Sequence, residues 1–220
     1  MPDPREADIV SADIKRAERV PPRQVLTHKW PVLHAGGIPH YAFYDALARE
    51  GGTVPADWRA DWKFAIWGEV EKPWECNYHD FRAMPTTKVY ADMHCVTRWS
   101  KLDNLWKGVA TREVMKHVKL LPSAKFALIH CEQGFTTNLP LDDFLGDDCL
   151  FAWGHDGDDL EPDHGYPLRL VIPKLYAWKS AKWVRGVQVL DVDQPGFWET
   201  WEHGGYHMRG DPWSEQRFRE

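Results

Sequence analysis

The segment TTKVYADMHCVTRWS, residues 86–100, joins a predicted β-strand to a cysteine with polar neighbours. Polar and apolar residues alternate in its first half, as in a half-buried strand, until Asp92 breaks the pattern. Beyond this point Cys95 stands between a histidine and, three residues on, an arginine. A thiol loses its proton readily only near donors or positive charge, which His94 and Arg98 can supply. The segment therefore predicts a strand that runs into a reactive thiol.

Other predicted strands surround this segment in the sequence. Apolar and aromatic stretches bounded by glycine or proline predict strands at 61–70, 125–131, 167–173 and 186–192. A short helix is predicted at 140–146, and the tail from residue 196 onward has little periodicity. We therefore expect one α+β domain over 25–220, mixed and mostly sheet. Residues 1–24 are predicted to form an extended or partly disordered lead-in that ends at two prolines.

One longer helix is predicted at 111–121. Thr111 is a plausible N-cap, apolar residues from Val114 to Leu121 recur at helical spacing, and Pro122 ends the run.

Composition excludes several classes of protein. The 220 residues carry a net charge of −6, and the basic residues are scattered, so nucleic acid is not an expected partner. No apolar stretch is long enough to cross a membrane, and the charged N-terminal segment does not resemble a signal peptide. We therefore expect a cytoplasmic protein without membrane insertion. The 13 tryptophans, many beside proline, glycine or lysine, indicate aromatic-rich packing in loops.

The four cysteines form no CxxC pair, so zinc-ribbon, thioredoxin and c-type haem sites are not expected. In a reducing compartment these thiols should be free.

Two further segments concentrate polar residues. DHGYPLRLVIP (163–173) places His164 and Arg169 around a turn before a strand, and LYAWKSAKWV (175–184) gathers Lys179, Ser180 and Lys182. Loops of this composition can bind a phosphate through backbone amides and ammonium groups. Together with the Cys95 segment they predict an anionic ligand beside a thiolate, and a soft thiolate suits a soft or high-valent metal. These local patterns do not name the metal.

At these segments the sequence resembles the sulfite oxidase family of molybdenum enzymes. The resemblance is to its short, haem-free branch, related to the bacterial periplasmic methionine sulfoxide reductase catalytic subunit. HCVTRWS resembles the family's metal-binding cysteine segment, DHGYPLRLVIP its His-Gly-aromatic-Pro-x-Arg turn, and KSAKW its pterin-contacting loop. WPVLHAGGIP resembles an N-terminal cofactor-contacting segment, and GYHMRGDPWSEQRF resembles the branch's C-terminal ending. The five segments agree in order and spacing from about residue 20 to 218.

The resemblance implies the family's molybdopterin-binding fold and a set of site residues. Cys95 becomes the protein thiolate on molybdenum, with two further sulfurs from the dithiolene of molybdopterin. The residues that it assigns to the cofactor are His34, Cys95, Cys131, His164, Arg169, Ser180, Ala181 and Lys182. Cys131 falls where a related bacterial reductase has a cofactor-contacting threonine. Thr97, Arg98 and His207 are candidates for contacts with substrate.

Three departures from the family bear on the substrate. Ala152-Trp153 stands where animal and plant sulfite oxidases have an Ala-Tyr pair, and tryptophan has no hydroxyl to ionise. A single arginine, Arg98, follows the metal-binding cysteine where those enzymes have several, which makes a weak site for sulfite. The family's dimerisation and haem domains are missing, so a monomer and a separate electron-transfer partner are expected.

The expected function is a molybdenum-molybdopterin oxidoreductase that transfers an oxygen atom to or from a small-molecule substrate in a two-electron reaction. Sulfoxide or N-oxide reduction and sulfite-type oxidation both fit. One alternative is a hydrolase with Cys95 as nucleophile and His94 or His130 as base. Adjacent residues of a strand point to opposite faces, which argues against His94. Another alternative is a non-catalytic module whose Trp-rich loops bind a partner.

Overall fold

A computed structural model describes residues 2–33, 36–200 and 209–215. Its strands are β1 (Ile9–Val10), β2 (Val25–Leu26), β3 (Lys63–Gly68), β4 (Trp74–Asn77), β5 (Thr87–Cys95), β6 (Trp99–Ala110), β7 (Phe126–Cys131), β8 (Thr136–Pro140), β9 (Leu150–His155), β10 (Asp158–Asp159), β11 (Arg169–Val171) and β12 (Val184–Leu190). Its helices are α1 (Tyr44–Arg49), α2 (Trp58–Asp61), α3 (Tyr78–Arg82), α4 (Thr111–Met115) and α5 (Leu141–Phe144), with 3-10 turns η1 (Pro4–Glu6), η2 (Ala12–Lys15), η3 (His40–Phe43), η4 (Glu132–Gly134) and η5 (Pro162–His164).

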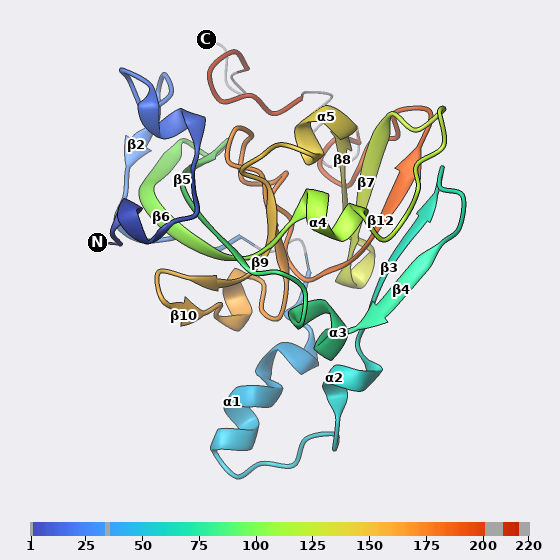
Figure 1. The fold of residues 1–220 in the computed structure, drawn as a ribbon. Helices are drawn as coiled ribbons and strands as arrows, with labels where there is room; N and C mark the ends of the chain where they lie inside the picture. Colours follow the sequence, from blue (N-terminus) through green and yellow to red (C-terminus); the bar gives the residue numbers. More distant parts are fainter. Residues whose placement is uncertain (1, 34–35, 201–208, 216–220) are drawn as a thin grey trace.

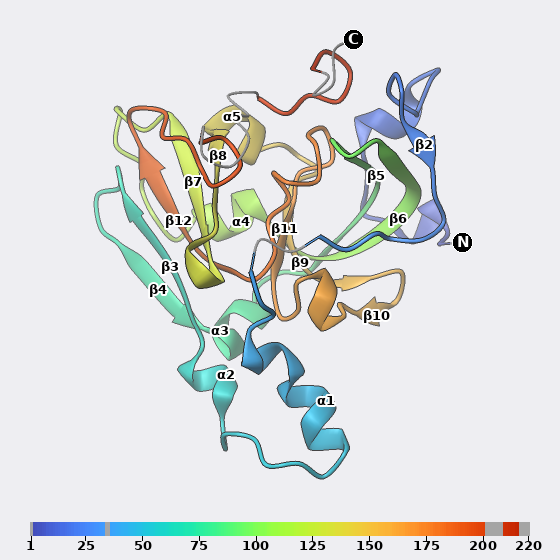
Figure 2. The same ribbon diagram turned by 180° about the vertical axis from the view of Figure 1, so that it is seen from behind.

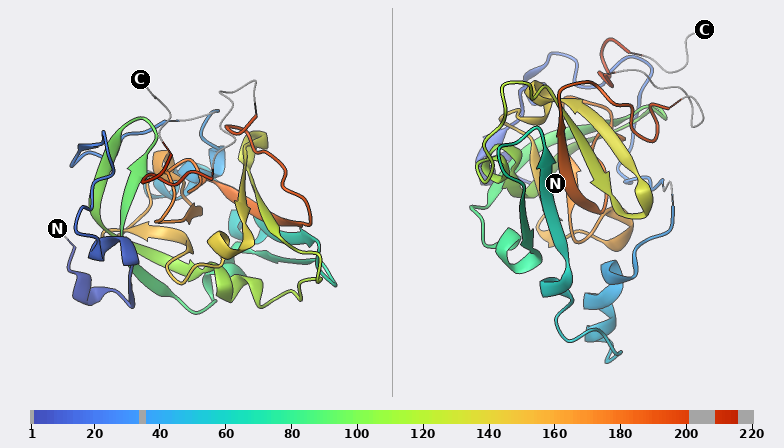
Figure 3. Two further views of the ribbon diagram at one scale, coloured as in Figure 1. Left: turned by 90° about the horizontal axis from the view of Figure 1, so that it is seen from above. Right: turned by 90° about the vertical axis from the view of Figure 1, so that its right-hand side faces the viewer.

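Among the described residues the strands form two sheets (Figure 1). The first has the order β1-β5-β6-β9-β10, with β2 paired to β6 and β11 paired to β9. The second has the order β4-β3-β12-β7-β8, in which β12 runs parallel to β3 and antiparallel to β7. From above, the β5–β6 hairpin and the second sheet lie on opposite sides of the molecule (Figure 3). This arrangement confirms the expected α+β class with mostly sheet.

Helices α1 and α2 lie at one end of the molecule, beyond both sheets (Figures 1 and 2). The core is built mainly from strands, because their β-branched and aromatic residues pack well on a pleated surface. Among the described residues, four buried tryptophans belong to this core: Trp58, Trp62, Trp106 and Trp153. Two of these, Trp106 and Trp153, lie within strands, so the expectation that tryptophan packs mainly in loops holds only for part of the set.

The predicted strands at 61–70, 86–95, 125–131 and 186–192 are confirmed as β3, β5, β7 and β12. The stretch predicted at 167–173 is shortened to β11, and the short helix at 140–146 is confirmed as α5. Strands β6 and β9 were not predicted.

The helix predicted at 111–121 is too long, because α4 ends at Met115. Beyond it the backbone pairs with another segment: Leu121 N–H donates to the Glu69 carbonyl, and Glu71 N–H donates to the Lys119 carbonyl. The predicted N-cap is also wrong. The cap residue is Ala110, and the Thr111 hydroxyl donates to the Phe144 carbonyl at 2.6 Å. Tertiary hydrogen bonds thus replace the local ones that the helical spacing favoured.

A β-bulge in β6 decides which side chains of the β5–β6 hairpin face inward. Ala91 pairs with Asn104, but Met93 pairs with Lys101, so β6 contains one extra residue. Asp103 in this bulge has φ +60, a left-handed conformation that aspartate tolerates better than most residues. Because of the bulge, Trp99 opposite Cys95 and Trp106 opposite Val89 lie on the same face of the hairpin.

The segment preceding residue 25 packs against this hairpin. Strand β1 pairs in parallel with β5, and the Ser11 hydroxyl donates to Asp148 at 2.6 Å. Arg19 reaches Asp92 and Asp103 through its guanidinium. The N-terminal segment therefore covers the outer edge of β5 and, through Arg19, the side chain of Asp92.

Candidate cofactor site

A cavity of about 330 Å³ opens beside the end of the β5–β6 hairpin. Six parts of the chain bound it: the segment from Trp30, the end of the β5–β6 hairpin, the turn between η4 and β8, the η5–β11 turn, the loop that leads into β12 and the segment after β12. The residues that line it are Trp30, Pro31, Val32, Leu33, Gly36, Met93, Cys95, Val96, Thr97, Trp99, Glu132, Gln133, Phe135, His164, Arg169, Ala177, Trp178, Ser180, Ala181, Lys182, Trp183, Phe197 and Trp198.

Cys95 is the last residue of β5 and lines the cavity. The Thr97 hydroxyl donates to its Sγ atom at 3.1 Å. Its carbonyl accepts the Arg98 N–H at 2.9 Å and the Gln24 side-chain amide at 2.9 Å, which holds the turn after the strand. Cys95 is therefore a half-buried thiol that carries a donor on its sulfur and faces an enclosed space.

The other three cysteines have a different environment. Cys76, Cys131 and Cys149 are buried, and burial raises the pKa of each thiol. They are not among the described residues that line the cavity. All four thiols are free, as expected.

Arg169 brings a positive charge into the interior. Its side chain is 3% exposed and donates to the carbonyls of His164 at 2.9 Å and Ser180 at 2.8 Å. Among the described residues no carboxylate forms an ion pair with it, and burial lowers the pKa of its guanidinium to about 9. A buried cation is very unfavourable without an opposite charge. The environment of Arg169 therefore favours an anionic ligand in the cavity.

Lys182 lies beside Arg169 and donates to the backbone carbonyls of Leu33 at 2.9 Å and Asp163 at 3.0 Å. Burial and the nearby Arg169 lower the pKa of its ammonium group to about 7. Gly165 allows this close approach, because a Cβ atom there would lie 3.0 Å from Arg169 Cβ and 3.1 Å from Lys182 Cβ. It also has φ +109, which favours glycine.

His164 completes this basic end of the cavity. Trp30 stacks on its ring with 3.8 Å between centroids, and the Arg169 guanidinium lies 5.0 Å from the Trp30 ring centre. We call His164, Arg169 and Lys182 the basic cluster.

Ser180 and Ala181 tie the basic cluster to the sheet. The Ser180 hydroxyl accepts the Ile172 N–H at 2.9 Å, and the Ala181 carbonyl accepts the Leu170 N–H at 2.8 Å. Both residues line the cavity.

The structure brings together most of the residues predicted from the sequence. Seven of them line the one cavity: Cys95, Thr97, His164, Arg169, Ser180, Ala181 and Lys182. Arg98 is exposed and Cys131 is buried in the core, and neither lines the cavity. His34 and His207 lie outside the described residues. Lys179, which the sequence groups with Ser180 and Lys182, instead forms a buried ion pair with Glu199.

Sequence reasoning missed much of the cavity's aromatic lining. Trp30, Trp99, Trp178, Trp183 and Trp198 all face it. The abundance of tryptophan was a signal, but no spacing in the sequence shows that these five residues converge. Trp153, at the position of the family's tyrosine, is 1% exposed and packs under the Arg82 guanidinium at 4.4 Å, not on the cavity.

The histidines proposed as bases for a Cys95 nucleophile have other contacts. His94 lies on the opposite face of β5, where its Nδ1 is 2.8 Å from the Ser100 hydroxyl. His130 contacts Gln188 at 3.0 Å and lies against the Trp67 ring, with 4.8 Å between centroids and an interplanar angle of 46°. These contacts argue against a thiol hydrolase.

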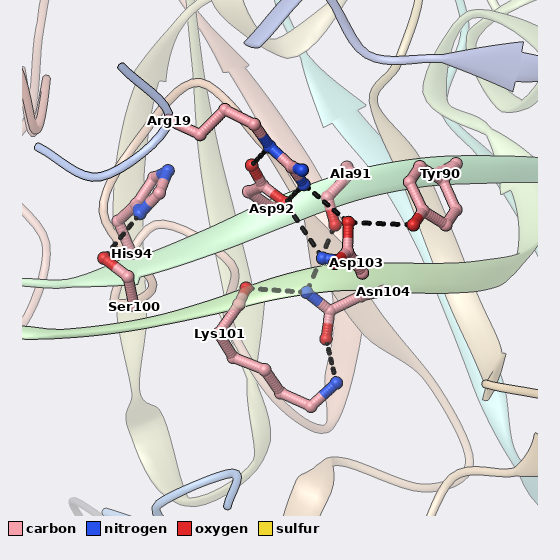
Figure 4. Close-up of polar contacts among 9 residues, drawn as sticks. All are labelled: Arg19, Tyr90, Ala91, Asp92, His94, Ser100, Lys101, Asp103 and Asn104. Atoms are coloured by element: carbon pink, nitrogen blue, oxygen red, sulfur yellow. Dashed lines mark hydrogen bonds and ion pairs between the residues drawn. The ribbon is translucent and has the colours of Figure 1, made fainter. Parts of the chain in front are cut away.

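A polar network stabilises the hairpin behind Cys95 (Figure 4). The Arg19 guanidinium donates to both oxygens of Asp92, at 2.9 and 2.7 Å, and to Asp103 at 2.6 Å. Tyr90 also donates to Asp103, at 2.8 Å, and the Asp103 N–H donates to Asp92 at 2.9 Å. This network holds the bulged residue and thereby the register of the two strands.

The fold and the cavity define a protein that binds an anionic ligand beside a single accessible thiol. The family model described as "oxidoreductase molybdopterin binding domain" matches residues 51–198, more than half of the chain. The chain belongs to this family. Its members bind molybdopterin with molybdenum, and the protein is therefore a molybdopterin-dependent oxidoreductase of the sulfite oxidase-like type.

Individual relatives agree with this assignment. The chain is 45% identical over 200 residues to the uncharacterized oxidoreductase YuiH of Bacillus subtilis, covering 91% of this chain and 92% of that protein. It is 28% identical over 172 residues to the protein-methionine-sulfoxide reductase catalytic subunit MsrP of Campylobacter jejuni, covering 66% of this chain and 56% of that protein. The sulfane dehydrogenase SoxCD of Paracoccus pantotrophus shares the fold, with a TM-score of 0.59 and 21% identity over 70% of this chain and 43% of that chain.

The described residues fit molybdopterin. The basic cluster suits its phosphate, and Cys95 supplies a thiol to the same cavity. The turn at Gly165 lets Arg169 and Lys182 of this cluster pack closely against the backbone. Within the described part of the chain no helix has the length and apolar character needed to cross a membrane.

Proposed function

We propose that this protein catalyses two-electron oxygen-atom transfer on a small organic substrate, with Cys95 as the protein ligand of molybdenum. The observation that supports this most is the position of Cys95, since it is the cysteine that shares a cavity with the buried, cationic Arg169. When bound, molybdenum in molybdopterin supplies a two-electron centre that can give up or accept an oxygen atom. The reductive direction is the one we favour, by likeness to MsrP.

The residues of the chain have separate roles in this proposal. The basic cluster binds the anionic part of the cofactor through charge-assisted hydrogen bonds, which are about twice as strong as neutral ones. Thr97 donates to the sulfur of Cys95 and orients it. Ser180 and Ala181 hold the loop that closes the cavity. The cofactor performs the redox chemistry, while the protein sets orientation, electrostatics and access. A separate protein supplies the electrons.

Elemental analysis tests this proposal directly. Wild-type protein from a host that makes molybdopterin should contain about one molybdenum per chain, and Cys95→Ser should lose the metal or its visible absorption. The matched control is Cys76→Ser, a buried cysteine of β4 outside the cavity. It should keep both. Equal molybdenum content and identical visible spectra in wild type and Cys95→Ser would exclude the proposed ligand.

A further inference from the structure

The cavity has two chemically different ends. The loop from Ala177 to Lys182 runs between them, because Ala177 N–H donates to the His94 carbonyl at 2.7 Å next to Cys95, while the Ser180 carbonyl accepts from Arg169. The basic cluster therefore contacts the second half of this loop, whereas the β5 backbone beside Cys95 contacts its first residue. If the basic cluster binds the cofactor's anionic part, the end at Cys95 remains for the substrate.

Aromatic side chains gather at the Cys95 end. Trp178 follows Ala177 directly, and its indole N–H donates to Glu199 at 3.0 Å. This contact brings the neighbouring Phe197 and Trp198 to the same end, and the Phe197 N–H donates to the Thr136 carbonyl at 2.8 Å, beside Phe135. All four aromatic residues line the cavity. We call Phe135, Trp178, Phe197 and Trp198 the aromatic wall.

The aromatic wall is held in place by buried polar contacts. Lys179 and Glu199 form an ion pair in which both side chains are 2% exposed. Glu199 also accepts from the Thr137 hydroxyl at 2.9 Å, and Lys179 donates to the Asn138 carbonyl at 2.8 Å. Gly196 fits against the Thr136 carbonyl, where a Cβ atom would lie only 2.5 Å away. These contacts fix residues 196–199 against β8, so the wall is pre-formed.

The charges at this end do not favour a small anion. Among the described residues that line the cavity, the arginine is Arg169 and the lysine is Lys182. Both belong to the basic cluster. Arg98, the arginine nearest to Cys95 in sequence, is exposed and does not line it. The acidic side chain that lines the cavity is Glu132, 3.3 Å from Arg185. Against the aromatic wall an inorganic oxyanion would lose hydration without the charge of the basic cluster, whereas an apolar group would gain by leaving water.

From this arrangement we infer that the aromatic wall selects uncharged organic oxides with an aromatic or bulky apolar substituent, such as aryl sulfoxides, over inorganic oxyanions. This inference rests on the proposed function. In the reaction the sulfur–oxygen bond breaks, two electrons from the reduced metal centre and two protons are consumed, and the products are a sulfide and water. A one-electron donor must reduce the centre twice per turnover, which a reduced viologen dye can do in an assay.

The test compares substrates on molybdenum-loaded protein with reduced benzyl viologen as donor. Methyl p-tolyl sulfoxide should have a kcat/KM at least about tenfold above that of dimethyl sulfoxide, a ratio typical of discrimination by an apolar pocket. Nitrate should be a poorer substrate than either. Trp198→Ala should lower the value for the aryl sulfoxide about tenfold and that for dimethyl sulfoxide less than twofold. Trp74→Ala, on β4 where Trp74 stacks on His117, is the matched control and should change neither.

A second readout does not depend on turnover. Calorimetry should show methyl p-tolyl sulfide binding to the loaded wild type, and binding about tenfold weaker to Trp198→Ala and to Phe135→Leu. The inference is overturned if loaded enzyme prefers nitrate or dimethyl sulfoxide, or if both wall variants bind the sulfide as the wild type does. These outcomes leave the ligand role of Cys95 standing, whereas full molybdenum content and an unchanged spectrum in Cys95→Ser would refute that role alone.

Discussion

The hydroxyl of Thr97 donates a hydrogen bond to the Sγ atom of Cys95 across 3.1 Å. Thr97 lies in the turn that follows β5, two residues after Cys95. The hydrogen bond from the Arg98 N–H to the Cys95 carbonyl fixes the backbone of this turn. A donor on a ligand sulfur withdraws electron density from it, which makes the sulfur a weaker donor to a bound metal.

Thr97→Val removes this donor while keeping the shape of the side chain. We expect the molybdenum content to be retained and the sulfur-to-metal absorption band to shift to lower energy. The shift should be on the order of the 1.5–3 kcal/mol that a hydrogen bond to a charged group contributes. Visible absorption of the loaded protein measures it. Thr97→Ser, which keeps the hydroxyl, should match the wild type, and a Val variant with an unshifted band would show that the hydroxyl does not act on the sulfur.

Arg169→Lys tests whether the buried guanidinium binds the cofactor. Lysine keeps the charge but cannot make the same set of fixed hydrogen bonds. Since a charge-assisted hydrogen bond contributes at least about 1.5 kcal/mol, pterin retained after purification should fall about tenfold or more. Pterin fluorescence after denaturation measures the content. Arg112→Lys, at an exposed arginine, is the control. Equal pterin content in the two variants would contradict the role of Arg169.

Lys182 should make the stability of cofactor-free protein depend on pH. Its pKa is lowered to about 7 in the fold from an ordinary 10.5. Below pH 7 the ammonium is charged in both states and its burial destabilises the fold. Between pH 7 and 10.5 the unfolded chain binds more protons, so this contribution makes the free energy of unfolding rise with pH. Above that range the unfavourable contribution is gone.

Lys182→Met should abolish this rise. The difference between wild type and variant should change by on the order of 2 kcal/mol from pH 6.5 to 10, a figure reduced for the partial exposure of the side chain. Urea unfolding at several pH values measures it. Lys116→Met, at an exposed lysine, should leave the pH dependence of the wild type unchanged. A Lys182→Met variant that keeps the full rise would assign it to other groups.

The accuracy of the sequence predictions depended on how local each interaction is. Strands such as β7 and β12 were predicted because their apolar residues are contiguous or alternate between turn formers. Strand β6 was missed because its bulge at Asp103 shifts the alternation by one residue, so that Trp99 and Trp106 share a face. The end of α4 was misplaced because its continuation pairs with Glu69 and Glu71, far away in the chain.

In the candidate site, too, residues in local motifs were predicted and residues positioned by distant contacts were not. Cys95, His164 and Arg169 were identified because each lies in a short motif, and the structure places all three on one cavity. The aromatic wall was not predicted, because its members come from the turn before β8, the loop before β12 and the segment after β12. Only tertiary hydrogen bonds, such as that between Trp178 and Glu199, bring them together.

The Arg19–Asp92 pair offers a test of how the N-terminal segment supports the site. Asp92 breaks the alternation of β5 in the sequence, and in the structure its side chain is 1% exposed and accepts two hydrogen bonds from Arg19 (Figure 4). Arg19→Met would leave a buried carboxylate without its cation, which typically destabilises a fold by about 3–5 kcal/mol. We expect a loss near the lower end, because the Asp103 N–H still donates to Asp92. Urea unfolding measures the loss, and molybdenum content should fall with it as the β5–β6 register loosens. The control is Arg5→Met, since the Arg5–Asp3 pair is exposed and exposed pairs contribute little to stability. If both variants unfold alike, the N-terminal segment does not stabilise the hairpin through this pair.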